Sequence, residues 1–157
     1  MVNIAELGQF LIDSNKAGYA GGEQKKWIKE ADLSTTIPFE KKPWRSHDNF
    51  FGGEPYGGRT VVFYNEHPVW MMVYYGWVDA GIENNLVYGI LRGALKNMPG
   101  DHPFRGPKEY TEGEFIYTNI WEGELKKFSG EENITRQGKL VYAAKYLGGL
   151  VDQKAGV

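Results

Sequence analysis

The side chains with the clearest chemical potential form one short cluster, made up of Trp44, Arg45, Ser46, His47 and Asp48. The guanidinium of Arg45 could hold an anion, and the carboxylate of Asp48 could orient the imidazole of His47. The ring of Trp44 could stack on a planar ligand. This pattern predicts the rim of a binding pocket. It also fits a surface loop in which Ser46 or Asp48 caps a turn.

Two further segments could complete such a pocket. Tyr19 lies close to Gly21-Gly22, where glycine permits a close backbone approach, and Arg105 lies between Phe104 and Gly106-Pro107. Arg105 could reach into a cleft, or it could pair internally with a glutamate. These residues favour a binding or sensing module for a small ligand or a protein partner, in which Arg105→Ala would weaken binding and leave the fold intact. The predicted ligand site consists of Tyr19, Trp44, Arg45, His47, Asp48 and Arg105.

Two other functions fit the same sequence. A small, metal-independent hydrolase would use His47 as a general base, assisted by Asp48, Glu54 or Arg105. A structural protein would instead form a homodimer through its aromatic side chains, which make up 15% of the chain. Seven glutamates between residues 109 and 132 could hold a catalytic carboxylate pair, but their positions in strands and turns favour a solvated face.

Composition and motifs exclude several classes of protein. The chain has no cysteine, which excludes disulfides and thiolate catalysis. His47, His67 and His102 lie in three separate predicted loops, so we expect no metal, and no motif for another cofactor is present. The net charge is −2 without a basic stripe, so we expect a small molecule or a protein as partner and no direct nucleic-acid binding.

The sequence also predicts where the protein is found. No apolar run approaches the roughly 20 residues of a membrane-spanning helix. The N-terminus lacks the charged and apolar regions of a signal peptide. We therefore expect a cytoplasmic protein without membrane association.

Periodicity of the apolar residues predicts the elements that position these side chains. Helical spacing predicts helices over residues 3–16 and 82–98, and residues 19–58 look rich in loops. The segment 69–78 is apolar on both faces, so we expect a central strand covered on both sides. Alternation and turn residues predict five strands in all, over residues 60–64, 69–78, 115–121, 125–134 and 140–147.

These elements define an α+β fold class, with an antiparallel sheet of about five to six strands packed with one or two helices. The length of 157 residues fits a single domain, with a core over about residues 3–150 and a C-terminal tail over 151–157. Residues 69–76 also align with residues 141–148, and each segment follows an aromatic residue and glycine. The similarity could reflect an internal duplication or a coincidence between two strand patterns.

Short motifs rich in glycine and aromatic residues occur along the chain in an order that resembles a family of uncharacterised bacterial and archaeal domains. They include Tyr19-Ala20-Gly21-Gly22, Ser46-His47-Asp48, Phe51-Gly52-Gly53, residues 68–76 and Phe104-Arg105-Gly106-Pro107. The resemblance covers about residues 8–150. Some members resemble C-terminal modules of helix-turn-helix (XRE-type) transcriptional regulators, which implies a sensing or interaction role. No DNA-binding helix pair precedes residue 8, so we expect such a role to require a partner.

Overall fold

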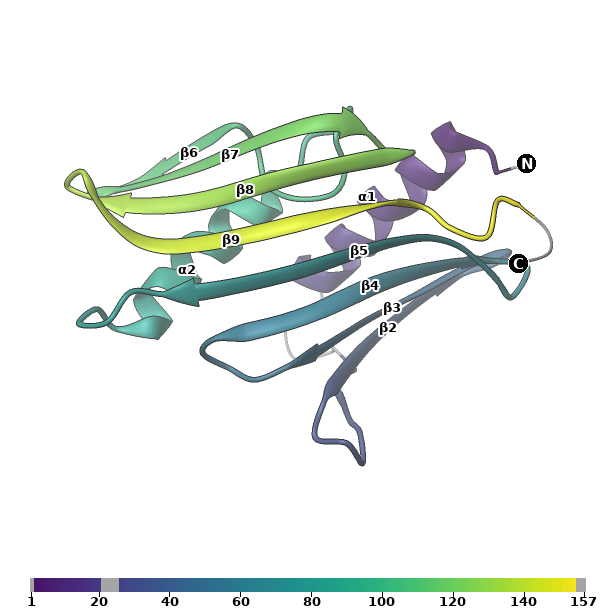
Figure 1. The fold of residues 1–157 in the computed structure, drawn as a ribbon, viewed down its shortest axis with the longest axis horizontal. Helices are drawn as coiled ribbons and strands as arrows, with labels where there is room; N and C mark the ends of the chain where they lie inside the picture. The colour runs from purple at the N-terminus through teal and green to yellow at the C-terminus, as the bar shows by residue number, and fades with distance from the viewer. Residues whose placement is uncertain (1, 21–25, 155–157) are drawn as a thin grey trace.

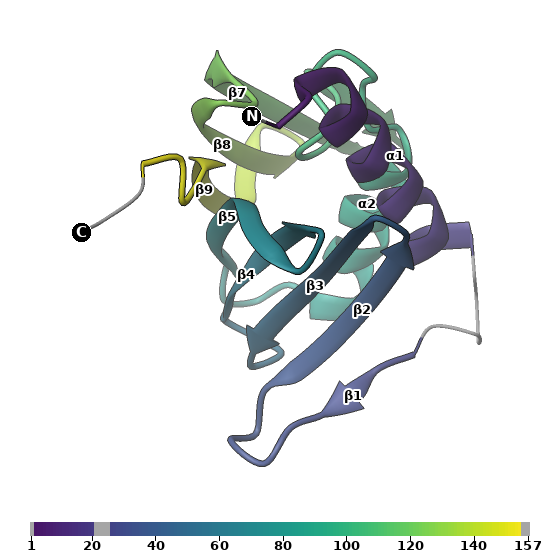
Figure 2. The same ribbon diagram turned by 90° about the vertical axis from the view of Figure 1, so that its right-hand side faces the viewer.

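The computed structural model describes residues 2–20 and 26–154, and it shows one curved antiparallel sheet with two helices on one face (Figures 1 and 2). The helices are α1 (Ile4–Ala20) and α2 (Asn84–Lys96). The strands are β1 (Ile28–Lys29), β2 (Thr35–Lys41), β3 (Trp44–Phe51), β4 (Tyr56–Tyr64), β5 (His67–Val78), β6 (Glu109–Glu112), β7 (Phe115–Glu124), β8 (Lys127–Arg136) and β9 (Lys139–Leu150). Their order across the sheet is β1-β2-β3-β4-β5-β9-β8-β7-β6. The predicted α+β class is therefore confirmed.

The described residues form nine strands, so the prediction of five to six was too low. Most of the difference lies in the segment 19–58, which contains β1, β2, β3 and the start of β4 instead of loops. Pro38 is the clearest reason for the error, because proline rarely occupies the interior of a sheet. Here β1 pairs only with Thr35 and Thr36, so Pro38 lies where the edge of the sheet is open.

Both predicted helices are present, and local side chains define their ends. Asn3 caps α1, because its Oδ1 accepts hydrogen bonds from the backbone N–H groups of Ala5 and Glu6. The side chain of Glu6 accepts a bond from Asn3 Nδ2 at 3.1 Å, which completes the interaction between the cap and the first turn. Leu7 and Phe10 then lie on the buried face of α1. The apolar stripe of each helix is thus directed at the sheet.

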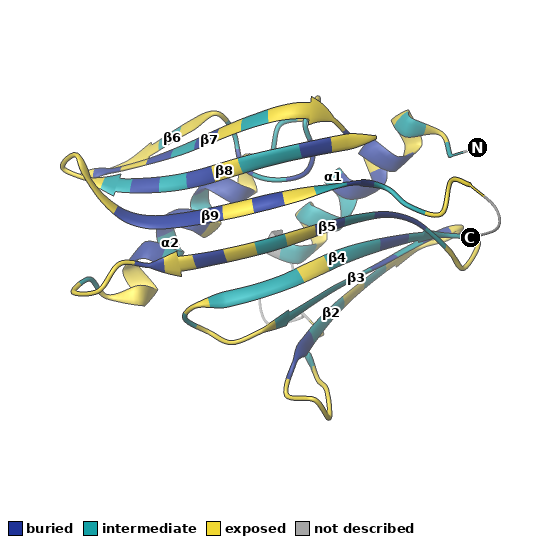
Figure 3. Cartoon of the chain, in the orientation of Figure 1, coloured by how far each residue is buried: buried dark blue, intermediate teal, exposed yellow. Residues whose placement is uncertain are grey.

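Strand β5 is central, but only one of its faces is covered. Trp70 and Met72 point to the helices and are buried, whereas Val73, Tyr75 and Trp77 on the other face are 37%, 54% and 38% exposed. The alternating colours along β5 in Figure 3 show this difference. Both helices lie on the same side of the sheet, so the expected second covering layer is missing from the described residues.

Two clusters of buried side chains fill the space between the sheet and the helices. The first joins Leu7 of α1 to Trp70 of β5, and the second joins Val87 of α2 to Tyr142 of β9. Burial of each such side chain contributes about 1.5–3 kcal/mol to folding. The clusters hold α1 against the first half of the sheet and α2 against the second half.

Apart from the two-residue strand β1, the fold consists of a helix followed by four strands, repeated once, and the predicted sequence repeat coincides with it. Strands β5 and β9 meet in the middle of the sheet, where Tyr74 lies directly opposite its counterpart Tyr146. The register shifts between Val62 and Phe63 in one half and between Ile134 and Thr135 in the other, at equivalent places. This pseudo-twofold arrangement favours an internal duplication over a coincidence.

The duplication also explains a pattern of aromatic rings above glycines. A Cβ added to Gly76 would lie 2.7 Å from the hydroxyl of Tyr56, and a Cβ added to Gly148 would lie 2.8 Å from the ring of Phe128. Each glycine is the register partner of the residue whose ring covers it. The absence of a side chain lets the ring lie flat across the neighbouring strand.

Candidate functional site

A cavity of about 780 Å³ lies between the inner face of the sheet and the two helices. Residues of α1, α2, strands β1 to β5, residues 26–27 before β1, the turn after β3 and the loop after α2 form its wall. The volume falls in the range of pockets that enclose small organic ligands. Six of its aromatic residues are Trp27, Phe50, Tyr56, Tyr74, Tyr88 and Phe104.

The first polar group in the cavity is the carboxylate of Asp48 on β3. Its Oδ1 accepts a hydrogen bond from the hydroxyl of Tyr74 at 2.5 Å and another from Oγ1 of Thr60 at 3.2 Å. Tyr74 belongs to β5, so its ring must cross β4, and it does so above Gly58. Burial and the neighbouring Asp48 carboxylate raise the pKa of Tyr74, which keeps its hydroxyl a donor at neutral pH.

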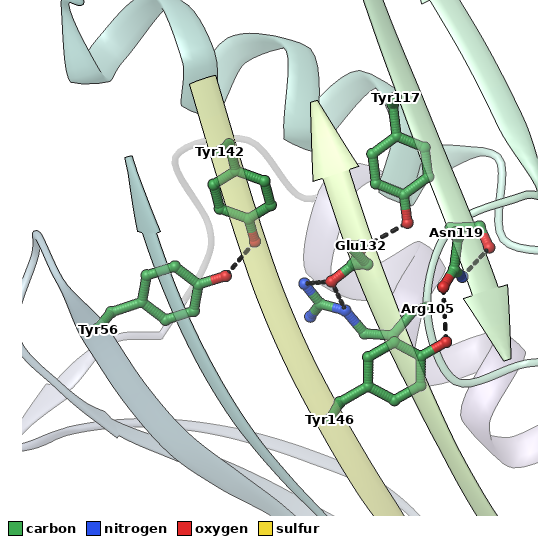
Figure 4. A network of polar contacts seen from close by, with 8 residues as sticks. Tyr56, Arg105, Tyr117, Asn119, Glu132, Tyr142 and Tyr146 are labelled. Atoms are coloured by element: carbon green, nitrogen blue, oxygen red, sulfur yellow. Dashed lines mark hydrogen bonds and ion pairs between the residues drawn. The ribbon is translucent and has the colours of Figure 1, made fainter. Parts of the chain in front are cut away.

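The second polar group is the guanidinium of Arg105, carried by the loop between α2 and β6 (Figure 4). Its Nε and Nη2 lie 2.7 Å and 2.6 Å from Oε1 of Glu132, whose side chain is fully buried. The hydroxyl of Tyr117 donates to the other carboxylate oxygen at 2.5 Å. Sequence analysis left open whether Arg105 reaches a cleft or pairs with a glutamate, and it does both.

Arg105 also lies next to the tyrosines of the cavity. Its Cζ is 5.8 Å from the centre of the Tyr74 ring, which in turn is bonded to Asp48. The hydroxyl groups of Tyr56 and Tyr142 are hydrogen-bonded to each other beside it (Figure 4). Burial is the main cause that raises the pKa of both phenols. This side of the cavity therefore carries an ordered network of polar groups, which is surrounded by aromatic rings.

In the second half of the fold, the loop that carries Arg105 covers the equivalent position. Tyr146 donates to Oδ1 of Asn119 at 2.7 Å, as Tyr74 donates to Asp48 in the first half. The Nδ2 of Asn119 donates to the carbonyl of Gly106 at 2.9 Å, which fastens the loop that carries Arg105 over this position. The cavity therefore belongs to the first half of the sheet.

Sequence analysis named six site residues, and two of them, Asp48 and Arg105, line this cavity. Trp44 is buried elsewhere in the core, where its ring stacks on Phe10 with centroids 5.7 Å apart. Tyr19 lies in the last turn of α1, but its side chain lies outside the described residues. So do Gly21 and Gly22, which were expected to follow it at the pocket.

Arg45 and His47 lie on the outer face of the sheet, because alternate residues of β3 point to opposite sides. Arg45 stacks on the ring of Phe63 with 4.0 Å between Cζ and the ring centre, and it pairs with Glu66 at 3.0 Å. The ring of His47 lies 5.3 Å from that of Phe63. Burial, followed by the charges of Arg45 and Arg59, lowers the pKa of His47.

This geometry does not assemble the groups of the hydrolase hypothesis. His47 and Asp48 are neighbours in β3 and point to opposite faces. Glu54 lies in the turn after β3, where its carboxylate accepts hydrogen bonds from the backbone N–H of Val78 and from the hydroxyl of Tyr88. The base, its orienting carboxylate and the assisting groups therefore do not share one site.

The seven glutamates between residues 109 and 132 also do not share one site, because they differ in burial. Six are exposed, as expected for a solvated face: Glu109, Glu112, Glu114, Glu122, Glu124 and Glu131. Glu132 is the exception, fully buried and paired with Arg105. Its inward position in β8 follows from alternation with the exposed Glu131, so the strand pattern alone could have singled it out.

The fold is an α+β domain built of two similar halves, with a pocket between its two helices and the first half of its sheet. The chain belongs to the family described as Domain of unknown function (DUF5680), whose model matches residues 48–151. This agrees with the resemblance to an uncharacterised family. No curated protein and no solved structure matches the chain. Within the described residues, neither helix has the length and hydrophobicity needed to cross a membrane.

Proposed function

We propose that this domain is a binding module for a small, largely apolar ligand, which occupies the cavity between the inner face of the sheet and the helices. The volume of about 780 Å³ and the aromatic wall are the main support. Such a cavity can remove most of the surface of a small organic molecule from water, and burial of apolar surface supplies the binding free energy.

The polar network supports a defined orientation of the ligand. Asp48 and Arg105 reach the cavity from a strand and from a fastened loop, and each is held by a hydrogen bond or an ion pair. Side chains fixed in this way lose little conformational freedom on binding. Any polar atom of the ligand that enters the cavity is therefore expected to face Asp48 and Arg105, while the apolar part contacts the aromatic rings.

The neutral fluorophore N-phenyl-1-naphthylamine tests the proposal, because its emission rises in an apolar environment. We expect saturable binding by the folded protein and a raised melting temperature, with about 2.7 kcal/mol of stabilisation at a ligand concentration 100 times the dissociation constant. Ala17 lines the cavity from the surface of α1. Ala17→Phe should block part of it and weaken binding by about tenfold.

The neighbouring residue provides a matched control. Lys16 is exposed on the same helix and is not part of the cavity wall, so Lys16→Phe should bind the fluorophore as the unchanged protein does. Both variants must first show a cooperative thermal transition, since loosely packed proteins also bind such dyes. Equal binding by the two variants, or no saturable binding by the unchanged protein, would contradict the proposal.

A further inference from the structure

We infer that the ligand is an amphipathic anion, with its apolar part in the cavity and its acidic group at the cationic mouth formed by Lys26, Lys29 and Arg92. This inference rests on the proposed function and specifies the chemistry of the ligand. It begins from the charges of the wall. The described lining residues include four cations, Lys26, Lys29, Arg92 and Arg105, but one carboxylate, Asp48. The whole chain, by contrast, has 20 acidic and 18 basic residues.

The charge of Arg105 is compensated within the protein. Both Nε and Nη2 are directed to Glu132, and the side chain of Arg105 is only 12% exposed. The excess positive charge therefore comes from the other three cations. Asp48 does not offset them at the mouth, because its contacts with Tyr74 and Thr60 place it at the strand wall.

Lys26, Lys29 and Arg92 are exposed side chains that border the cavity from two separate parts of the fold. Lys26 and Lys29 flank Trp27 at the edge strand β1, and Arg92 belongs to α2. Within the part of the chain that the structure describes, none of the three forms an ion pair. Lys29 is held by a hydrogen bond from Nζ to Oγ1 of Thr35 at 2.7 Å.

The cations at the mouth and the aromatic rings inside the cavity match the acidic and the apolar end of an amphipathic anion. An acidic group between the lysines and Arg92 would remain partly hydrated, which avoids the cost of burying a charge. The ring of Trp27, which packs edge-on against Phe50 with centroids 5.7 Å apart, would contact the apolar part next to that group. A ligand cation at the mouth would instead be repelled.

Two fluorophores with the same ring system separate the effect of ligand charge on binding from the effect of ligand shape. 1-Anilinonaphthalene-8-sulfonate is an anion, and N-phenyl-1-naphthylamine is its neutral counterpart. We expect the double variant Lys29→Glu and Arg92→Glu to weaken binding of the sulfonate by about tenfold or more and to leave the neutral compound within about twofold. Raising the salt concentration should weaken only the sulfonate, because salt screens exposed charges.

Arg59 provides the control for charge reversal. It is exposed on β4 and is not a cavity residue, so Arg59→Glu should leave binding of both fluorophores unchanged. If the double variant binds the sulfonate as tightly as the unchanged protein does, the inference fails while the proposed function stands. If the neutral compound does not bind at all, the proposed function itself fails.

Competition then distinguishes the two main sources of such an anion. Dodecanoate represents acyl chains and 2-naphthoate represents planar aromatic acids, and each has a neutral alcohol of the same shape. The inference is supported if either acid displaces the sulfonate at a concentration at least about tenfold lower than its alcohol requires. The acid that does so identifies the chemical class of the ligand. Equal displacement by acid and alcohol overturns it.

Discussion

The ion pair between Arg105 and Glu132 has almost no access to water. The two side chains are 12% and 0% exposed, and both contacts from the guanidinium reach the same carboxylate oxygen. The chain contains a second pair of the same geometry, in which Nε and Nη2 of Arg136 lie 2.8 Å and 2.5 Å from Oε1 of Glu114. This second pair is 42% and 37% exposed. Burial is therefore the main difference between them.

Removal of the buried arginine should destabilise the fold. Arg105→Met leaves the carboxylate of Glu132 in the core without its cation, which costs about 3–5 kcal/mol of unfolding free energy. Arg136→Met removes the exposed counterpart and should cost less than about 1 kcal/mol. Urea unfolding followed by circular dichroism measures both values. The structure thus revises the expectation that Arg105→Ala leaves the fold intact.

A double variant tests the cause of this loss. Arg105→Met combined with Glu132→Gln removes both charges and keeps an acceptor for the hydroxyl of Tyr117. It should recover much of the stability lost in Arg105→Met, because the cost arises from an unpaired buried charge. A loss of the same size in the double variant would show that packing of the arginine stem matters more than its charge.

At the scale of the elements, rings that cross strands depend on the glycines beneath them. A Cβ on Gly130 would lie 2.2 Å from the ring of Tyr146, which must pass over β8 to reach Asn119. Gly130→Ala should therefore displace this ring and cost about 1–3 kcal/mol, as overpacking does elsewhere. Thermal or urea unfolding measures the loss.

Gly89 is the matched control, because it lies in α2 and an added Cβ would meet nothing within 4 Å. Gly89→Ala should stabilise the protein by about 0.5–1 kcal/mol through the helix preference of alanine. If Gly130→Ala has the same melting temperature as the unchanged protein, the prediction is wrong, because the ring of Tyr146 would then be able to move away from the added methyl group at no cost.

Sequence patterns predicted the strongly periodic elements well. Both helices, the β4–β5 hairpin and the strands β7 to β9 follow from apolar spacing. The predicted break between the strands over 115–121 and 125–134 lies further along the chain, at Leu125-Lys126. Strands β1 to β3 were missed, because Pro38 and a polar run in β3 resemble a loop. This error also explains why Arg45, His47 and Asp48 do not lie together, since a loop could gather these side chains, whereas a strand directs them to opposite faces.

Asp48 and Arg105, the two predicted site residues that line the cavity, have partners in distant parts of the chain. Asp48 is held by Tyr74 across an intervening strand, and Arg105 is held by Glu132 from a different strand. The sequence shows the residue types but not the register that brings them together. Only two features of these contacts could have been predicted from the local sequence. They are the inward position of Glu132, which follows from strand alternation, and Gly58, which leaves space for a ring.

For the molecule as a whole, the inner face carries several buried phenols. Burial is the main cause that raises the pKa of Tyr74, Tyr117 and Tyr142. Unfolding exposes these groups, which then ionise above about pH 10, whereas the folded protein keeps them protonated. The unfolded state thus binds fewer protons, and the free energy of unfolding should fall above about pH 10, by up to about 1.4 kcal/mol per pH unit for each group.

Phenolate absorbance and circular dichroism, followed together during an alkaline titration, measure this effect. The buried phenols should ionise only as the sheet unfolds, so their phenolate absorbance should rise together with the loss of the circular dichroism signal. Ionisation of nearly all tyrosines in a protein with an unchanged circular dichroism spectrum would contradict the packing of the inner face.

The ladder between β5 and β9 suggests how such a chain could arise. A polypeptide with one half alone would end its sheet at an unpaired edge, which readily accepts another strand. Since Tyr74 faces its own counterpart across the ladder, a second copy of the same half would complete the sheet in this register. The present chain is what fusion of two such subunits would produce. Fusion frees the copies to diverge, and here one retains Asp48 at an open cavity while the other has Asn119 beneath a closing loop.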